Sequence, residues 1–392
     1  MGKAEQTWDV RNWDEAAYKA SLEAEREAST RIVYAARLGP ASDLLATASS
    51  NGNVCLYSIT SCLDSQLAKS SIRETQRAME PVLYLSRHDG AAYDLQFYGE
   101  GEAAILLSCG DDGKIQGWHW KDINEGARFG RVNGKPWKPD FVLVNPQLKG
   151  VRGALAPMPE TNSIATNSQE GCIFSATGSG HAYCWDIETE KIITTFEGHS
   201  DYLHCISSRP SHKQVITGSE DGTVRVWDCR SATSIAILDA CKAINVSQTP
   251  KEKRPWVSCA ALDSSEKWLV CGSGGNCLTL WSLLSWDAVT RISTLSAPQA
   301  VTIENNQIMT VGALPYLTCF TYGGDVISQI DVAPLSAFSV SAYPSGIDDS
   351  WPIEEMERRD EGFALLEKQE AEFTRLQKQV EEMQKALSHP EV

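Results

Sequence analysis

The chain has 392 residues, a formal net charge of −16 and 42% hydrophobic residues, which is enough for a sizeable core. The acidic balance argues against general polyanion binding, because phosphate contacts need clustered Lys and Arg. The 12 Cys include no C-x-x-C pair, so we expect no zinc site. The sequence contains no run of about 18 apolar residues, so we expect no membrane span.

The N-terminal segment, residues 1–30, is predicted to be helical. Its helix is expected over residues 12–29, where Asn12 or Asp14 can cap the first turn and several Ala favour the helix. From Arg31 the pattern changes to short alternating segments, which are typical of β-strands.

A short unit recurs six times along the rest of the chain, and VITGSEDGTVRVWDC (215–229) is its clearest copy. Each copy has a strand pattern, a turn of small residues and a second strand pattern that ends in an aromatic residue. The units span residues 44–59, 105–120, 173–187, 215–229, 268–283 and 308–322. The aligned aromatics are Tyr57, Trp118, Trp185, Trp227, Trp281 and Phe320.

The spacing of these aromatics predicts the fold. Trp185 and Trp227 are 42 residues apart, which matches one four-stranded blade of a WD-repeat β-propeller. Longer spacings are explained by insertions at 60–84, 121–150 and 240–254. The sequence therefore predicts an all-β, WD-repeat β-propeller over residues 31–346.

The end of the propeller departs from the repeat. Residues 337–343 are predicted to form one strand, and the turn at residues 344–346 ends the β pattern. We expect a seven-bladed ring whose last blade is incomplete. Either an N-terminal segment completes the ring, or the ring keeps exposed strand edges.

The fourth unit carries a set of polar residues that the WD-repeat pattern buries. His199, Ser219, Asp221 and Trp227 are predicted to form a hydrogen-bonded chain from Trp through Ser and His to Asp. Such a buried set is stable only if every member has a partner.

The second unit retains part of the same set. His88, Asp112 and Trp118 are present, and Gly110 is expected at the position of the Ser. We interpret both histidines as structural hydrogen-bonding groups. The glycine-rich segments lie between two strands, whereas a phosphate loop needs a following helix. We therefore predict no catalytic residues, no cofactor and no metal site.

One basic stretch in the second insertion is interleaved with aromatic residues. Such a stretch can follow single-stranded RNA, but it is also consistent with a solvated loop whose aromatics pack on the propeller. We favour the loop and expect any RNA contact to be weak or indirect. The four candidate residues are Arg128, Arg131, Lys135 and Lys138.

The C-terminal segment, residues 347–392, is acidic and has a heptad pattern. From Asp348 onward it contains 13 acidic and 6 basic residues, a net charge of −7. Apolar residues repeat every seven positions over 366–387, so a helix with a coiled-coil seam is predicted. This helix is expected to pair with a partner helix or to lie on the propeller. The repeating residues are Leu366, Phe373, Val380 and Leu387.

The end of the fourth unit reads Trp227-Asp228-Cys229-Arg230. This matches the motif of WD-repeat proteins that dock on the damaged-DNA-binding adaptor of cullin-RING ubiquitin ligases. Arg230 is expected on the face of the ring, where it can pair with a carboxylate of the adaptor. The alternative is a well-formed blade with no docking role.

Three segments together resemble the THO complex subunit 6 family: GHSDYLHCISSRPSHKQVITGSEDGTVRVWDCR (198–230), HDGAAYDLQF (88–97) and WLVCGSGGNCLTLW (268–281). The resemblance covers roughly residues 30–345. It implies a non-catalytic propeller in the nuclear THO/TREX assembly, acting in mRNA processing and export with other THO/TREX subunits as partners. Plant members also resemble substrate receptors of the cullin-RING ligase, which implies a role in hormone and abscisic acid signalling.

Overall fold

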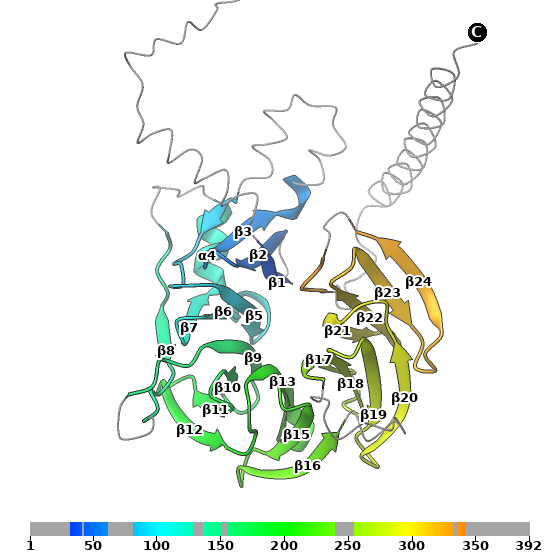
Figure 1. Cartoon of the computed structure of the whole chain (residues 1–392). Helices are drawn as coiled ribbons and strands as arrows, with labels where there is room; N and C mark the ends of the chain where they lie inside the picture. The colour runs from blue at the N-terminus through cyan, green and yellow to red at the C-terminus, as the bar shows by residue number, and fades with distance from the viewer. Residues whose placement is uncertain are drawn as a thin grey trace, which may run out of the picture.

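The structure is a computed structural model that describes residues 32–40, 43–61, 81–128, 136–149, 155–239, 255–332 and 336–341. These residues form six four-stranded antiparallel sheets, arranged as the blades of a propeller (Figure 1). Every blade consists of four consecutive strands paired in chain order. The predicted all-β WD-repeat propeller is therefore confirmed.

The blades are numbered in chain order. Blade 1 contains β1 (Val33–Leu38), β2 (Leu44–Ser49), β3 (Val54–Ser58) and β4 (Leu83–Tyr84), and blade 2 contains β5 (Ala92–Tyr98), β6 (Ile105–Gly110), β7 (Lys114–His119) and β8 (Phe141–Val144). Blade 3 contains β9 (Thr161–Asn167), β10 (Cys172–Thr177), β11 (Ala182–Asp186) and β12 (Lys191–Phe196), and blade 4 contains β13 (Leu203–Arg209), β14 (Gln214–Ser219), β15 (Thr223–Asp228) and β16 (Thr233–Asp239). Blade 5 contains β17 (Val257–Leu262), β18 (Trp268–Ser273), β19 (Cys277–Ser282) and β20 (Asp287–Ser293), and blade 6 contains β21 (Pro298–Glu304), β22 (Gln307–Gly312), β23 (Tyr316–Phe320) and β24 (Val326–Asp331).

The aromatic that closes each repeat unit lies in the third strand of its blade, as the spacing predicts. In blades 2 to 5 the middle strands are apolar on both faces, because a neighbouring blade covers each face. In blade 4, Val215 and Trp227 pack toward blade 3, and Ile216, Val224 and Val226 pack toward blade 5. The core is therefore a series of clusters between adjacent blades.

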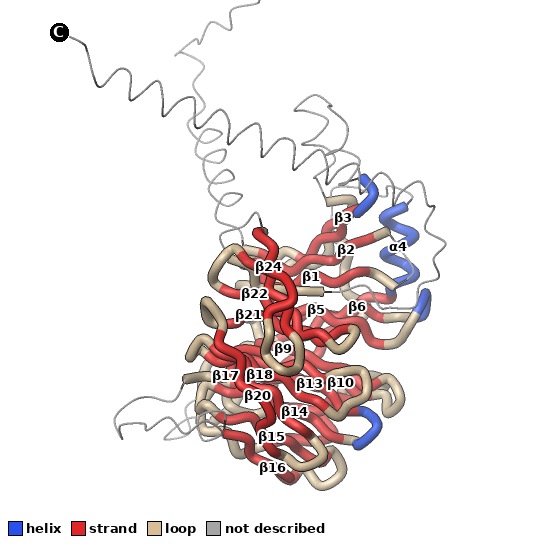
Figure 2. Tube along the Cα trace, turned by 90° about the vertical axis from the view of Figure 1, so that its right-hand side faces the viewer, coloured by secondary structure: helices blue, strands red, loops and turns tan. Residues whose placement is uncertain are grey.

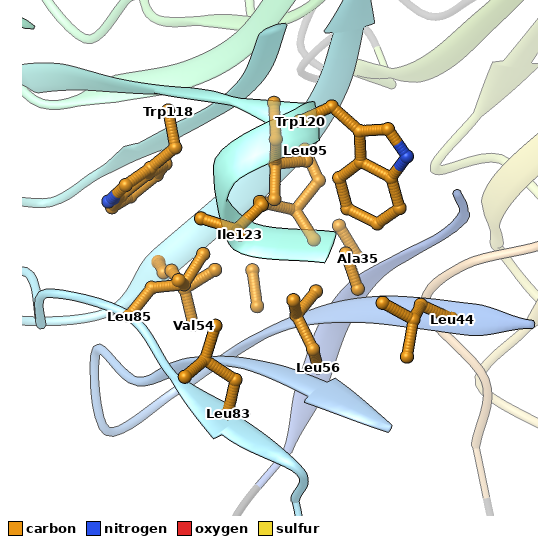
Figure 3. Packing of buried hydrophobic residues seen from close by; sticks show 14 of the residues in the cluster. Ala35, Leu44, Val54, Leu56, Leu83, Leu85, Leu95, Trp118, Trp120 and Ile123 are labelled. Atoms are coloured by element: carbon orange, nitrogen blue, oxygen red, sulfur yellow. The ribbon is translucent and has the colours of Figure 1, made fainter. Parts of the chain in front are cut away.

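The insertion predicted over 121–150 contains regular structure. Helix α4 (Trp120–Arg128) starts directly after β7 and lies beside the first two blades (Figures 1 and 2). Its Trp120 and Ile123 are fully buried in a cluster with Leu56 of β3 and Leu95 of β5 (Figure 3). Strand β8 then completes blade 2, so this insertion supplies both a helix and an outer strand.

The last predicted strand is wrong for the residues that the structure describes. Residues 337–341 have no strand pairing, and no seventh sheet occurs within the described ranges. The segment instead joins blades 6 and 1 by single contacts. The Ala337 amide donates to the Gly312 carbonyl at 2.9 Å, and the Ala36 amide donates to the Ser339 hydroxyl at 3.2 Å. A strand needs a ladder of backbone bonds, and these two contacts do not form one.

The two predicted terminal helices, in residues 1–30 and 347–392, lie outside the described residues. They stay predictions, as does an N-terminal segment that completes the ring. Of the helices in the described part, none has the length and apolar character that crossing a membrane requires.

Candidate partner-docking surface

The polar set of blade 4 forms a continuous hydrogen-bonded chain beneath the surface of the ring. The indole N–H of Trp227 donates to Oγ1 of Thr217 at 2.8 Å. That hydroxyl lies 2.8 Å from Nε2 of His199, and Nδ1 of His199 lies 2.8 Å from Oδ2 of Asp221. Because a carboxylate only accepts, Nδ1 carries the proton, and in the neutral ring Nε2 accepts from the Thr217 hydroxyl.

Ser219, predicted as the hydroxyl of this chain, does not belong to it. Val215 is paired with Trp227 in the β14–β15 register, so Thr217 is two residues away and Ser219 is four. Four strand residues span about 13 Å, beyond the reach of the indole. Ser219 instead donates to the Asp201 carbonyl at 3.2 Å and accepts from the Asp221 amide at 3.1 Å, which holds the turn.

Blade 2 shows the same shift of register. His88 contacts Ser108 Oγ at 2.7 Å through Nε2 and Asp112 Oδ1 at 2.9 Å through Nδ1. The predicted position, Gly110, has no room for a hydroxyl, since a Cβ there would lie 2.4 Å from the Ala91 carbonyl oxygen. Trp118 does not join this hydrogen-bonded chain, because its indole N–H donates to the Trp137 carbonyl at 3.4 Å.

Sequence reasoning therefore missed the residue that supplies the hydroxyl. It lies on the second strand of the blade, two positions after the residue that pairs with the aromatic. Its signal is a small polar residue in the middle of the second strand. The residues at this position in blades 1 to 6 are Thr47, Ser108, Ser175, Thr217, Cys271 and Thr310. In blade 3, Trp185 donates to Ser175 at 3.0 Å. In blade 5 a thiol replaces the hydroxyl, and within the described residues the buried indole N–H of Trp281 has no hydrogen-bond partner.

The two buried carboxylates of these chains are held in the charged form. Burial alone would raise the pKa of Asp221, but hydrogen bonds from His199 and Thr223 outweigh it and hold the pKa well below its usual range. Asp112 follows the same pattern: burial raises its pKa, and His88 more than compensates. Both histidines have a partner on each ring nitrogen, which supports their predicted structural role.

The candidate docking residues divide between core and surface. Trp227 is 1% exposed and packs against Phe196 at 5.8 Å between ring centroids, so it supports the motif from inside the blade. Arg230 has a 70% exposed side chain, and its guanidinium donates to Oδ2 of Asp228 at 2.9 Å. The Arg230 amide also donates to Oδ1 of Asp228 at 2.8 Å.

This Asp–Arg pair presents a fixed cation at the end of blade 4. Hydrogen bonds from the Arg230 side chain and amide lower the pKa of Asp228 to about 2. Lys213, another exposed cation of blade 4, is paired with blade 3 instead: its ammonium lies 2.5 Å from a carboxylate oxygen of Glu170. The arrangement offers an exposed guanidinium edge, which can bind a carboxylate of a partner.

The candidate RNA residues are not brought together in the part of the chain that the structure describes. Arg131, Lys135 and the side chain of Arg128 lie outside it, and Lys138 is exposed. Trp137 packs against the core of blades 1 and 2, as expected for a solvated loop with anchoring aromatics. The RNA contact stays a prediction.

Three surface residues lie close enough together to be considered as ligands of one metal ion. Among the described residues, His119, Asp122 and Asp140 are the only trio of potential ligands within 4.8 Å of one another, and all three are exposed. Nδ1 of His119 is already 2.8 Å from Oδ2 of Asp140. Hydrogen bonds from the His119 amide and ring to Asp140 account for the close approach of these two residues.

Known proteins match the chain over the propeller. The family model "WD domain, G-beta repeat" matches residues 190–228 and 246–282, which end at the third strands of blades 4 and 5. The chain is 43% identical to "THO complex subunit 6" of Arabidopsis thaliana over 346 residues, covering 86% of this chain and 92% of the relative. It is 28% identical to "THO complex subunit 6" of Homo sapiens over 311 residues, covering 79% and 82% of the two chains.

Replacing the hydroxyl of the blade 4 chain is expected to cost more than replacing Ser219. Thr217→Val keeps the shape but leaves the Trp227 indole and His199 without a shared partner. We expect the free energy of unfolding to fall by about 2 kcal/mol. Ser219→Ala removes turn contacts only and should cost about 1 kcal/mol or less. Urea titration followed by Trp fluorescence compares the two, and an equal or larger loss for Ser219→Ala would contradict the assignment.

The Asp221 carboxylate is expected to make stability dependent on pH in the acid range. Its pKa is lower in the folded chain than the ordinary value of about 4, so its stabilisation is present above that value and is lost as the pH falls through the folded pKa. Asp221→Asn should therefore be less stable than the parent chain by about 1–3 kcal/mol at pH 7, with a smaller difference near pH 3. Unfolding curves at stepped pH measure this. Asp287→Asn, at an exposed carboxylate on β20, is the control, and a difference independent of pH would refute the prediction.

Proposed function

Because this chain belongs to the THO complex subunit 6 family, we propose that it is a non-catalytic scaffold subunit of the nuclear THO/TREX assembly, acting in mRNA processing and export. The observation that carries the proposal is the 43% identity to the Arabidopsis subunit over 92% of that protein. Its partners are then the other THO/TREX subunits.

The geometry is consistent with a scaffold role. His88 and His199, the two most buried of the described histidines, use both ring nitrogens within their own blades, so neither is free to act as a general base. The blades share clusters of buried side chains with their neighbours, which gives a stiff support for exposed loops. A stiff support with variable loops suits simultaneous contacts with several subunits.

Purification of the tagged chain tests this function. An affinity-tagged chain expressed in Arabidopsis cells should localise to the nucleus and recover other THO subunits in near-stoichiometric amounts, measured by quantitative mass spectrometry. Cells that express the tag alone from the same vector are the control. No enrichment of THO subunits above that control would reject the assignment.

A second candidate function is substrate reception for a cullin-RING ubiquitin ligase, including a role in hormone and abscisic acid signalling. Arg230 supports it, because the side chain is exposed and the neighbouring Asp228 holds its guanidinium. A charged side chain that is already ordered loses less conformational entropy on binding. The helix partner expected for residues 366–387 belongs to the same class of untested contacts, since that segment lies outside the described residues.

Arg230→Ala is expected to weaken binding to the damaged-DNA-binding adaptor about tenfold or more, because it removes the charged side chain assigned to the centre of this contact. The variant should unfold at the same urea concentration as the parent chain, because Arg230 contacts mainly solvent and Asp228. Lys213→Ala, which removes another exposed cation on blade 4, is the matched control. Biolayer interferometry with the purified adaptor measures the affinity, and unchanged binding by Arg230→Ala would leave the motif as part of a blade only.

A further inference from the structure

The centre of the ring contains a cavity that the proposed scaffold role does not use. The first strands of all six blades and residues 338–341 line this cavity, which has a volume of about 410 Å³. Three aromatic side chains from separate elements meet in its wall: Tyr34 of β1, Tyr93 of β5 and Phe338. The Tyr34 ring lies 5.5 Å from Tyr93 and 5.5 Å from Phe338 between centroids, and all three rings are partly exposed.

Carboxylates accompany these rings. Asp94 lines the cavity with a side chain that is 13% exposed, and it accepts from the Ser163 hydroxyl at 2.9 Å. The Tyr93 hydroxyl donates to the exposed Asp111 at 3.3 Å. Burial, followed by the charge of Asp111, raises the pKa of Tyr93 to about 12, and Glu160 adds to this effect. The electrostatic potential at Tyr93 is therefore negative.

The one Lys or Arg side chain that lines the cavity within the described chain is already in use. The Arg37 guanidinium lies 3.7 Å from Asp94 and donates to the Ala36 carbonyl at 3.1 Å. Burial still outweighs Arg37 in setting the pKa of Asp94, which is raised. Carboxyl groups other than Asp94 add negative charge here: Glu304 lines the cavity, and the exposed Asp111 contacts Tyr93.

Aromatic faces and carboxylates together recognise cations, because the ring face is electron-rich and the carboxylate accepts charged hydrogen bonds. A phosphate or a nucleic acid would meet repulsion at this place. Among cations, a guanidinium suits the site best, since its plane packs on an aromatic ring while its N–H groups bind a carboxylate in a fork. The cavity has room for a long side chain but not for a folded element.

We propose that this channel mouth, defined by Tyr34, Tyr93, Phe338 and Asp94 of the cavity wall with Asp111 beside Tyr93, binds an arginine side chain presented by an extended basic segment of a partner protein. The contact goes beyond the scaffold role and does not depend on it. Loss of peptide binding in the purified chain would leave recovery of THO subunits untouched, so the two proposals fail separately.

Binding of a labelled peptide to the purified full-length chain tests this proposal. The probe is fluorescein-labelled Gly-Gly-Arg-Gly-Gly-Arg-Gly-Gly, followed by fluorescence anisotropy at low and at physiological ionic strength. We expect saturable binding, weaker binding of the Lys version, and none of the version in which neutral citrulline replaces Arg. A labelled uridine oligonucleotide of similar length should not bind. No saturable binding of the Arg peptide, or competition between it and the oligonucleotide, would overturn the proposal.

Substitutions place the binding at the channel mouth. Asp111→Asn combined with Glu160→Gln removes two negative charges that act on Tyr93, and Tyr93→Leu removes one ring. Each variant is expected to bind the Arg peptide about tenfold more weakly. The matched controls are Asp287→Asn and Tyr202→Leu, an exposed carboxylate and an exposed ring outside the cavity. Urea midpoints verify that each variant is folded. Equal weakening by the controls, or none by the channel-mouth variants, would refute the site.

Discussion

The contact between each blade and the blade before it supports the rest of this structure. In blade 4 the Trp227 ring lies against Phe196 of blade 3, and its N–H is satisfied by Thr217 inside its own blade. An aromatic ring supplies a large apolar area at this joint, and the hydrogen bond removes the cost of burying its polar edge. A β-sheet of four short strands cannot bury both of its faces alone, so stability arises between blades.

A second set of contacts ties the blades together along the central cavity. Asp94 on blade 2 accepts from the Ile164 amide of blade 3 at 3.1 Å, and Asn162 of blade 3 donates to the Leu203 carbonyl of blade 4 at 2.8 Å. Ser258 of blade 5 donates to the Pro298 carbonyl of blade 6 at 2.6 Å. These polar links run between innermost strands, where the backbone groups facing the cavity would otherwise need other partners. They hold the cavity wall and the loops above it in fixed positions.

The junction between blades 6 and 1 is built differently. Each blade consists of its own four consecutive strands, so within the described residues no exchanged strand joins the first blade to the last. Residues 337–341 take that place through Ala337 and Ser339, and Phe338 contributes a ring to the channel mouth. The same segment thus connects the ends of the ring and completes the proposed channel mouth, which links ring closure to recognition.

Sequence alone determined the blades, because strand alternation and a recurrent aromatic are local signals that a buried four-stranded sheet requires. It identified His199, Asp221 and Trp227 but placed the hydroxyl at Ser219, since spacing along one strand does not reveal which residues oppose each other across two strands. The β14–β15 register shows that Thr217 supplies this hydroxyl. Only the tertiary structure could show that residues 337–341 form no strand, because strand formation depends on a paired neighbour. Likewise, Tyr34, Tyr93 and Phe338 are far apart in the chain: the packing of blade 1 on blade 2 brings the Tyr34 ring within 5.5 Å of Tyr93, and closure of the ring brings it within 5.5 Å of Phe338.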